Sequence, residues 1–294
     1  MHIFITGSES FIGGFLWNHL AAAGHQLSGI DAAPPTREGG IQMDLRDPRL
    51  AEQIPAGATI IHLAAVSTDP LCKADPLGGF DINIAGTIQL AKAAALRGAS
   101  QFIFASTEWV YGDVSNSAVQ TEDQPIDLAR IQGSYALSKL VGENVLRLSG
   151  LPNVTVLRFG IVYGPRRKNW SAVESLLDKV LRGEAISIGS AQTSRRFIYV
   201  QDLCAGIEAS LGRTGYDIFN LTGEHNVSLG EVIQTAGQLF GGPLSVVETS
   251  PNTPSIRNPP NDKAKALLGW TPKTSLEHGL KTVASFLSES KRSE

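Results

Sequence analysis

The sequence has little of what marks secreted, metal-binding or membrane proteins. Its two cysteines, Cys72 and Cys204, form no C-x-x-C pair, so we expect reduced thiols in a reducing compartment. Its six histidines show no H-E-x-x-H spacing, and we expect no bound metal. No apolar run approaches the roughly 18 residues that span a bilayer. Residues 2–5 already predict a strand, which leaves no room for a signal peptide.

Charge is close to balanced as well. The formal net charge is −3 over 294 residues, with no long basic or acidic run, which disfavours nucleic-acid and membrane-surface partners. No internal repeat is visible. A hydrophobic content of 42% is enough to bury a large core. We therefore expect a cytoplasmic protein that acts on small molecules.

Short apolar runs alternate with longer amphipathic segments in the first half of the chain. Strands that alternate with helices form parallel β-α-β units with right-handed crossovers, so the pattern predicts an α/β fold with a doubly wound parallel sheet. The predicted strands cover residues 2–6, 26–31, 59–63, 101–105 and 153–158, and the predicted helices cover residues 11–23, 78–97 and 133–148.

The character of the sequence changes after Gly164, where proline and basic residues cluster (164–168) and the later elements are shorter. We expect a first domain of residues 1–164 and a smaller mixed α/β lobe of residues 165–294, with some chain returning to the first domain. Ligands of open α/β sheets bind at the carboxyl edge of the strands, where we place this lobe. Its predicted helices cover residues 172–182, 228–240 and 275–288, and its predicted strands residues 195–200 and 217–221.

A glycine-containing turn joins the first strand to the first helix. Gly7 can take the tight turn, and Gly13 lets helix and strand approach closely. Ser10 stands where the middle glycine of the usual three would be. Asp31 ends the second strand, about twenty residues after the glycines, where a carboxylate binds both hydroxyls of an adenosine ribose. This combination predicts a Rossmann-type NAD site; Asp31 would repel a 2′-phosphate, although the nearby Arg37 keeps NADP open.

A hydride-transfer site is predicted by Tyr135 and Lys139, which lie one helical turn apart and so share a face. A free tyrosine has a pKa near 10. An ammonium and a cationic nicotinamide would both favour the phenolate and so lower that pKa. The same lysine would also hold the nicotinamide ribose.

A hydroxyl at the end of the fourth strand would complete the site. Thr107 is the expected third catalytic residue, with Ser106 behind it, because a hydroxyl there can hydrogen-bond the substrate oxygen whose charge changes. Glu108 is either a solvated carboxylate or a group that binds substrate or moves a proton.

These motifs resemble those of the extended short-chain dehydrogenase/reductases, specifically the NAD-dependent epimerase/dehydratase group that acts on nucleotide sugars. The resemblance runs nearly end to end. Its motifs are Thr6-Gly7-x-x-Ser10-x-x-Gly13, His62-Leu63-Ala64-Ala65, Asn83 with Gly86-Thr87, Ser106-Thr107 through Val110-Tyr111-Gly112, Tyr135/Lys139, Leu157-Arg158 through Tyr163-Gly164-Pro165, Arg196 through Asp202, Phe219-Asn220-Leu221 and Leu268 through Pro272.

The resemblance implies roles for the matched positions. Asn83 would support the active-site helix, and the helices of residues 78–97 and 133–149 would form a homodimer. Ser106, Thr107, Glu108, Arg196 and Arg257 would bind substrate, the two arginines through a diphosphate. The cofactor-binding residues would be Gly7, Ser10, Phe11, Ile12, Gly13, Asp31, Asp44, Leu45, Leu63, Ala64, Ala65, Asn83, Tyr135 and Lys139.

Three departures from the family pattern bear on the activity. Ser10 replaces a glycine in the cofactor turn. Trp109 stands where dehydratases carry the second member of an acid/base pair, and tryptophan cannot transfer a proton, which disfavours dehydration. Ile161 replaces an asparagine that in many relatives touches the diphosphate side of the substrate.

The expected activity is NAD-dependent epimerisation of a nucleotide-linked sugar at C4, through transient hydride transfer and a keto intermediate. The alternative is a net keto-sugar reductase or a sugar or alcohol dehydrogenase that uses Thr107, Tyr135 and Lys139 and exchanges its cofactor. A third reading, from a different class, is a non-catalytic NAD(H)-sensing protein. The nucleotide base and the sugar are left open.

Overall fold

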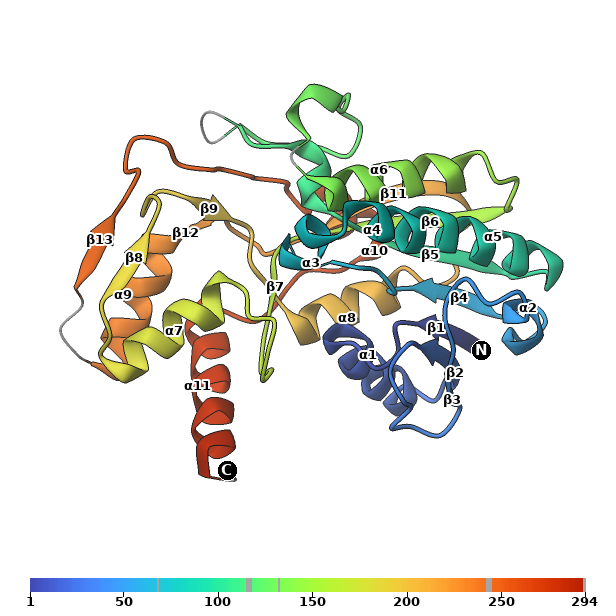
Figure 1. Cartoon of the computed structure of the whole chain (residues 1–294), viewed down its shortest axis with the longest axis horizontal. Coiled ribbons are helices and arrows are strands. Elements are labelled where there is room, and N and C mark those ends of the chain that lie inside the picture. The colour runs from blue at the N-terminus through green and yellow to red at the C-terminus, as the bar shows by residue number, and fades with distance from the viewer. Residues whose placement is uncertain (68, 115–117, 132, 242–244, 293–294) are drawn as a thin grey trace.

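A seven-stranded parallel sheet organises the computed structural model (Figure 1), which describes residues 1–67, 69–114, 118–131, 133–241 and 245–292. The strand order is β11-β6-β5-β4-β1-β2-β3, the reversal beside β1 being the place where doubly wound folds bind ligands. The strands are β1 (His2–Thr6), β2 (Gln26–Asp31), β3 (Gly40–Gln42), β4 (Thr59–His62), β5 (Gln101–Thr107), β6 (Asn153–Phe159) and β11 (Gly215–Leu221).

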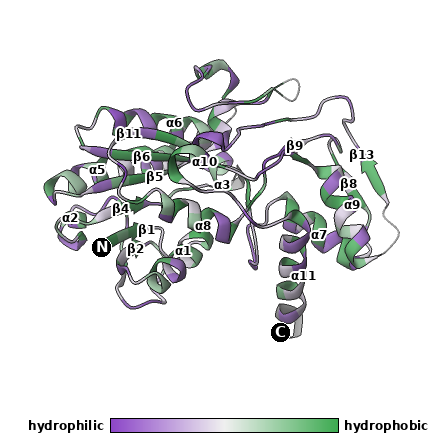
Figure 2. Cartoon of the chain, turned by 180° about the vertical axis from the view of Figure 1, so that it is seen from behind, coloured by the Kyte–Doolittle hydropathy of each residue, from purple (hydrophilic) through white to green (hydrophobic). Residues whose placement is uncertain are grey.

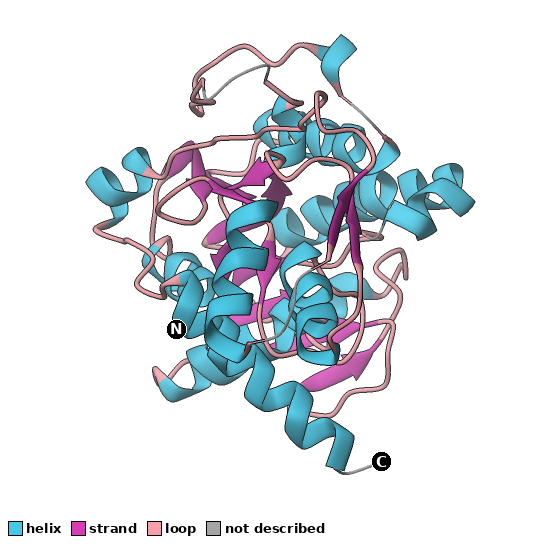
Figure 3. Cartoon of the chain, turned by 90° about the vertical axis from the view of Figure 1, so that its left-hand side faces the viewer, coloured by secondary structure: helices cyan, strands magenta, loops and turns pink. Residues whose placement is uncertain are grey.

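Both faces of this sheet are buried, because side chains alternate along each strand. Ile3 and Ile5 point into one core, and Phe4 between them points into the other. Figure 2 shows the central strands in the green of hydrophobic residues, and Figure 3 shows helices on either side of them. The first core is covered by α1 (Phe11–Ala22), α8 (Val200–Ala209) and α10 (Asp262–Leu268), and the second by α2 (Leu50–Gln53), α5 (Gly86–Leu96) and α6 (Ser134–Arg147).

The helix predicted over residues 78–97 is interrupted. It consists of α4 (Pro76–Phe80), a π-helical turn η1 (Asp81–Ala85) and α5, preceded by α3 (Asp69–Ala74). Single π-helical turns within α-helices are frequent at functional sites. Here the turn carries Asn83, which is buried against α6.

A second group of elements packs beyond the carboxyl ends of the strands. Its core joins α7 (Ala172–Arg182), α9 (Leu229–Phe240) and α11 (Leu276–Arg292), which lie together on the left of Figure 1. Strand β11, although late in the chain, pairs in parallel with β6 and belongs to the large sheet. The short pairs are β7 (Val162–Tyr163) with β10 (Ile198–Tyr199), β9 (Ser194–Arg195) with β12 (Val227–Ser228), and β8 (Ile186–Ile188) with β13 (Val246–Glu248).

None of the helices in the described part of the chain combines the length and the hydropathy that a membrane crossing requires.

Two short 3-10 turns complete the fold, η2 (Glu108–Tyr111) directly after β5 and η3 (Leu128–Arg130) before α6. Turn η2 starts where β5 reaches the carboxyl edge, so it carries the residues after Thr107 towards the second lobe.

Candidate active site

The turn between β1 and α1 has the close contacts that require glycine. Gly7 has a φ of +74°, and a Cβ there would come within 2.8 Å of the backbone nitrogen of Ala64. A Cβ on Gly13 would come within 2.1 Å of the Gly7 carbonyl oxygen. Ser10 is the N-cap of α1, and its Oγ accepts a hydrogen bond from the Gly13 amide at 3.0 Å. The Ser10 side chain therefore caps the first turn of α1.

A cleft of about 780 Å³ begins at this turn. It runs along the carboxyl ends of β1, β2 and β4 to the active-site helix α6. Gly13 packs behind it and Asn83 supports it, so neither lines its wall. The predicted cofactor residues that line it are Gly7, Ser10, Phe11, Ile12, Asp31, Asp44, Leu45, Leu63, Ala64, Ala65, Tyr135 and Lys139.

The far end of the cleft is acidic. Asp31 accepts hydrogen bonds from the backbone amides of Glu9 and Ala33, both at 2.9 Å. Arg37 is the residue whose charge left NADP as an alternative cofactor. It donates a hydrogen bond to the Glu9 carboxylate at 2.7 Å. Its charge is therefore already neutralised, and a 2′-phosphate would meet carboxylates on this side.

The predicted catalytic residues come together where β5 ends against α6. Tyr135 lines the cleft, and both Tyr135 and Thr107 line the pocket beyond it. The Lys139 side chain is buried, with Nζ 5.9 Å from the centre of the Tyr135 ring and 4.8 Å from that of Phe104. The helix approaches the strand closely because Gly142 faces Phe104, and a Cβ there would come within 2.7 Å of the ring.

The electrostatics of this pair differ from the sequence expectation. Burial raises the pKa of Tyr135, with the neighbouring Cys72 adding to the rise and the Thr107 hydroxyl opposing it. Burial also lowers the pKa of Lys139 to about 7, against the pull of Glu143. For both side chains the largest cause is burial, which disfavours the charged form of each.

A buried chain of polar groups holds α6 in place. Asn83 donates to Ser138 Oγ at 3.0 Å and makes two hydrogen bonds with the backbone of Val66, at 2.8 and 3.0 Å. His62 bridges Thr6 Oγ1 and Thr87 Oγ1 at 2.7 and 2.9 Å. These contacts link the loops after β1 and β4 to α6, the helix that carries Tyr135.

A second network, which the sequence analysis missed, positions Ser106. Its Oγ donates to Glu143 at 2.5 Å, and Arg158 binds the same carboxylate through two nitrogens at 3.0 and 2.7 Å. Arg158 also donates to the hydroxyl of Tyr111 at 2.9 Å. A signal was available, because Glu143 lies four residues after Lys139 and so on the same face of the helix.

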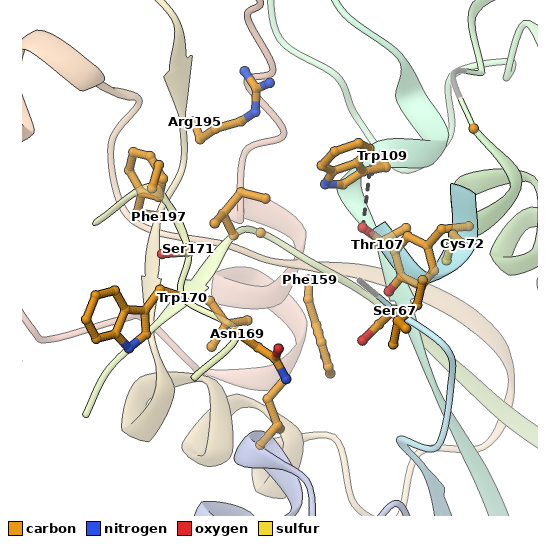
Figure 4. A pocket seen from close by; sticks show the side chains of 18 of the residues that line it. Ser67, Cys72, Thr107, Trp109, Phe159, Asn169, Trp170, Ser171, Arg195 and Phe197 are labelled. Carbon is orange, nitrogen blue, oxygen red and sulfur yellow. Dashed lines mark hydrogen bonds between the residues drawn. The ribbon is translucent and has the colours of Figure 1, made fainter. Parts of the chain in front are cut away.

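A larger pocket of about 870 Å³ opens beyond Tyr135 (Figure 4). Thr107, Cys72 and Trp109 form one wall, whereas Trp170 and Phe197 lie across from them. Ile161 lines the pocket too, so the departure from the family pattern noted at this position lies within the site. Ser106 and Tyr135 line both this pocket and the cofactor cleft, and the two cavities therefore meet at the predicted catalytic hydroxyls.

The structure separates the two arginines predicted to grip a diphosphate. Arg196 does not line the pocket; it donates to Asn258 at 2.7 Å and to the Glu224 carbonyl oxygen at 2.8 Å. Arg195, one residue earlier, lines the pocket instead (Figure 4). Arg257 is buried behind it, with its guanidinium 4.3 Å from the centre of the Trp109 ring and paired with Asp113 at 3.0 Å.

Glu108 is buried rather than solvated. Its carboxylate lies 3.5 Å from Arg195 and 3.8 Å from Arg257, and neither of its oxygens accepts a hydrogen bond within the described part of the chain. Burial raises the pKa of Glu108 to about 7, although both arginines pull it down. When it is ionised, Glu108 therefore offsets part of the positive charge of Arg195 and Arg257.

The stability of the fold should depend on pH through Glu108. Because the folded-state pKa lies near 7, above the ordinary 4.5, the contribution is complete below pH 4.5 and is lost as pH rises through 7, by about 3 kcal/mol. Urea unfolding between about pH 5 and pH 8 should show this loss in the wild type and not in Glu108→Gln. Equal pH slopes for the two proteins would contradict the assignment.

Comparison with known proteins agrees with this geometry. Residues 3–222 match the profile of the NAD dependent epimerase/dehydratase family. A Bacillus subtilis protein named uncharacterized UDP-glucose epimerase YtcB is 29% identical over 98% of both chains. UDP-glucuronic acid decarboxylase 1 of Xenopus tropicalis is 28% identical, over 98% of this chain and 72% of its own. The Thermus thermophilus UDP-glucose 4-epimerase, solved in complex with NAD, superposes with a TM-score of 0.85 at 26% identity, covering 98% and 99% of the two chains.

The matched region runs from the second residue of β1 to just beyond β11 and therefore covers almost all of the large sheet. The superposition with a solved relative confirms the Rossmann-type α/β fold expected from the sequence. The family profile confirms the resemblance that the motifs carried. The chain therefore belongs to the NAD dependent epimerase/dehydratase family.

Proposed function

We propose that this chain is an NAD-dependent epimerase that inverts C4 of a nucleotide-linked sugar. The observation that carries the proposal is the position of Tyr135, whose side chain lines both cavities. A residue that takes a hydroxyl proton while hydride leaves the same carbon must contact both the sugar and the cofactor. The names of the Bacillus and Thermus relatives support an epimerase.

The cofactor cleft fits NAD better than NADP. The Cβ-free surfaces of Gly7 and Gly13 shape the turn that would cradle a pyrophosphate. Asp31 faces the cleft at its acidic end, and Arg37 is bound to Glu9 instead of being open to a 2′-phosphate.

The chain's own residues carry the proton side of the reaction. The chemistry that NAD supplies when bound is reversible hydride acceptance from the sugar carbon. Tyr135 removes the hydroxyl proton and later returns it, and Thr107, which lines the same pocket, stabilises the sugar oxygen as its charge changes. When Lys139 is protonated, its ammonium group lies near Tyr135 and favours the phenolate form of that tyrosine. The keto sugar must turn over in the pocket before hydride returns to its other face.

A second candidate activity is a net keto-sugar reductase or a sugar or alcohol dehydrogenase. It uses the same three residues, and it is favoured by Ile161, which gives the pocket wall an apolar side chain where many relatives carry an asparagine. An NAD(H) sensor is less compatible with the site, because a sensor has no need of a buried tyrosine and lysine at the junction of two cavities.

The deciding experiment offers the purified chain UDP-, GDP-, CDP- and dTDP-linked sugars, including UDP-glucuronic acid. An epimerase should hold stoichiometric NAD after purification and form a C4 isomer with no net change in NADH absorbance. Steady consumption of added NAD(P)H would replace the proposal with a reductase, and loss of carbon dioxide from UDP-glucuronic acid would replace it with a decarboxylase.

We also propose that the protein works as a cytoplasmic homodimer. Exposed leucines lie on the helices through which the resemblance implies dimerisation, with Leu77 78% exposed at α4 and Leu96 77% exposed on α5. Leu148, just after α6, is 73% exposed. Neither Cys72 nor Cys204 is part of a disulfide in the described part of the chain, which is usual in a reducing compartment.

A further inference from the structure

A basic segment, residues 165–169, lies where the two cavities meet. Arg166 and Asn169 line both the cofactor cleft and the substrate pocket. Arg167 and Lys168, between them, line the cofactor cleft alone. The segment thus crosses the junction of the two cavities, and Arg167 and Lys168 face the cofactor cleft.

The start of this segment is held in place at Arg166. Arg166 binds the buried carboxylate of Glu174 at 2.7 Å, and its guanidinium lies 4.5 Å from the centre of the Phe11 ring. The Arg166 carbonyl oxygen accepts a hydrogen bond from Trp170 at 2.8 Å. Since Phe11 is the first residue of α1, these contacts place the segment beside the glycine turn.

The two central cations, Arg167 and Lys168, form no ion pair with a described carboxylate. In the part of the chain that the structure describes, no carboxylate forms an ion pair with Arg167 or Lys168, and both are exposed. The acids of the same cleft are engaged elsewhere: Glu9 pairs with Arg37, and Asp44 with Arg46. Two unpaired positive charges beside a helix start favour a doubly charged anion between them.

We propose that Arg167 and Lys168 form a cationic strap over the cofactor cleft that binds the pyrophosphate of the dinucleotide. The inference rests on the NAD binding proposed above, and it supplies a reason for the cofactor to stay bound through a cycle that consumes none of it. A sugar nucleotide also carries a diphosphate. The cofactor is favoured because neither residue lines the substrate pocket.

The test compares Arg167→Gln/Lys168→Gln with a charge-matched control, Lys273→Gln/Lys281→Gln, whose residues are exposed and line neither cavity. Binding of NADH and of ADP-ribose is measured on full-length chain freed of cofactor, at about 0.05 M and about 0.3 M salt. The strap variant should bind both about tenfold more weakly at low salt, and with less dependence on salt. UDP binding should be unchanged.

Other outcomes would overturn the inference in distinguishable ways. Unchanged NADH affinity, or an equal loss in the control variant, would show that the segment adds only general charge. A loss confined to UDP would assign it to the substrate diphosphate. If the wild-type chain bound neither NADH nor ADP-ribose, the proposed function itself would fail, whereas tight wild-type binding with an unaffected variant would sink the strap alone.

Discussion

Replacing Tyr135 with phenylalanine should lower turnover by about a hundredfold to ten-thousandfold, because only the phenolic oxygen that moves the proton is lost. The ring still fills the junction of the two cavities, so NAD affinity should change little. Turnover is measured on the sugar nucleotide found in the substrate panel, and NADH affinity by fluorescence titration.

Tyr216→Phe is a suitable control, because Tyr216 lies on the edge strand β11 and is 38% exposed. It should keep both turnover and NAD binding. If Tyr135→Phe turned over normally, the proton would have to move through another group, and the role proposed for Tyr135 would be wrong. If it lost NAD binding together with activity, Tyr135 would be mainly a structural residue.

Replacing Glu143 with glutamine should destabilise the fold by about 3–5 kcal/mol, since it leaves the Arg158 guanidinium buried beside a neutral partner. Both side chains of this ion pair are only 3% exposed, and the carboxylate also holds Ser106 at the site. Urea unfolding monitored by circular dichroism gives the loss, and a constant m-value would show that the same surface is exposed on unfolding.

A matched substitution at an exposed pair shows how much of this loss comes from burial. Glu277→Gln removes the partner of Lys281 on α11, where both side chains are more than half exposed, and should cost less than about 1 kcal/mol. The double variant Glu143→Leu/Arg158→Leu should recover part of the loss of Glu143→Gln, because it leaves no unpaired charge. A loss at Glu143 no larger than that at Glu277 would contradict the buried-pair account.

Most of the large sheet could be predicted because its strands are apolar runs separated by helical periods. Residues 2–6 and 26–31 match β1 and β2 to the residue. Strand β3 and helices α8 and α10 were missed, since β3 is three residues long and the two helices pack on the sheet from the second half of the chain. The π-helical turn at Asn83 was also missed, because it leaves the helical spacing of the sequence almost unchanged.

The site residues that belong to sequence motifs could be predicted. The glycine turn, Asp31 and Tyr135 all line the expected cleft. The choice between Arg195 and Arg196 depends on the register of β9, a strand of two residues that is too short to show an alternation. The raised pKa of Tyr135 depends on burial by segments distant in the sequence, which no local pattern reveals.

The most direct test of the central claim follows the hydrogen at C4. The sugar nucleotide that the chain converts is prepared with deuterium on that carbon and allowed to reach equilibrium with its isomer. The account predicts that deuterium stays on C4 of the product, with none in the solvent and none in released cofactor, because the hydride leaves and returns within one bound cofactor. Deuterium released to water, or carried away on free reduced cofactor, would contradict it.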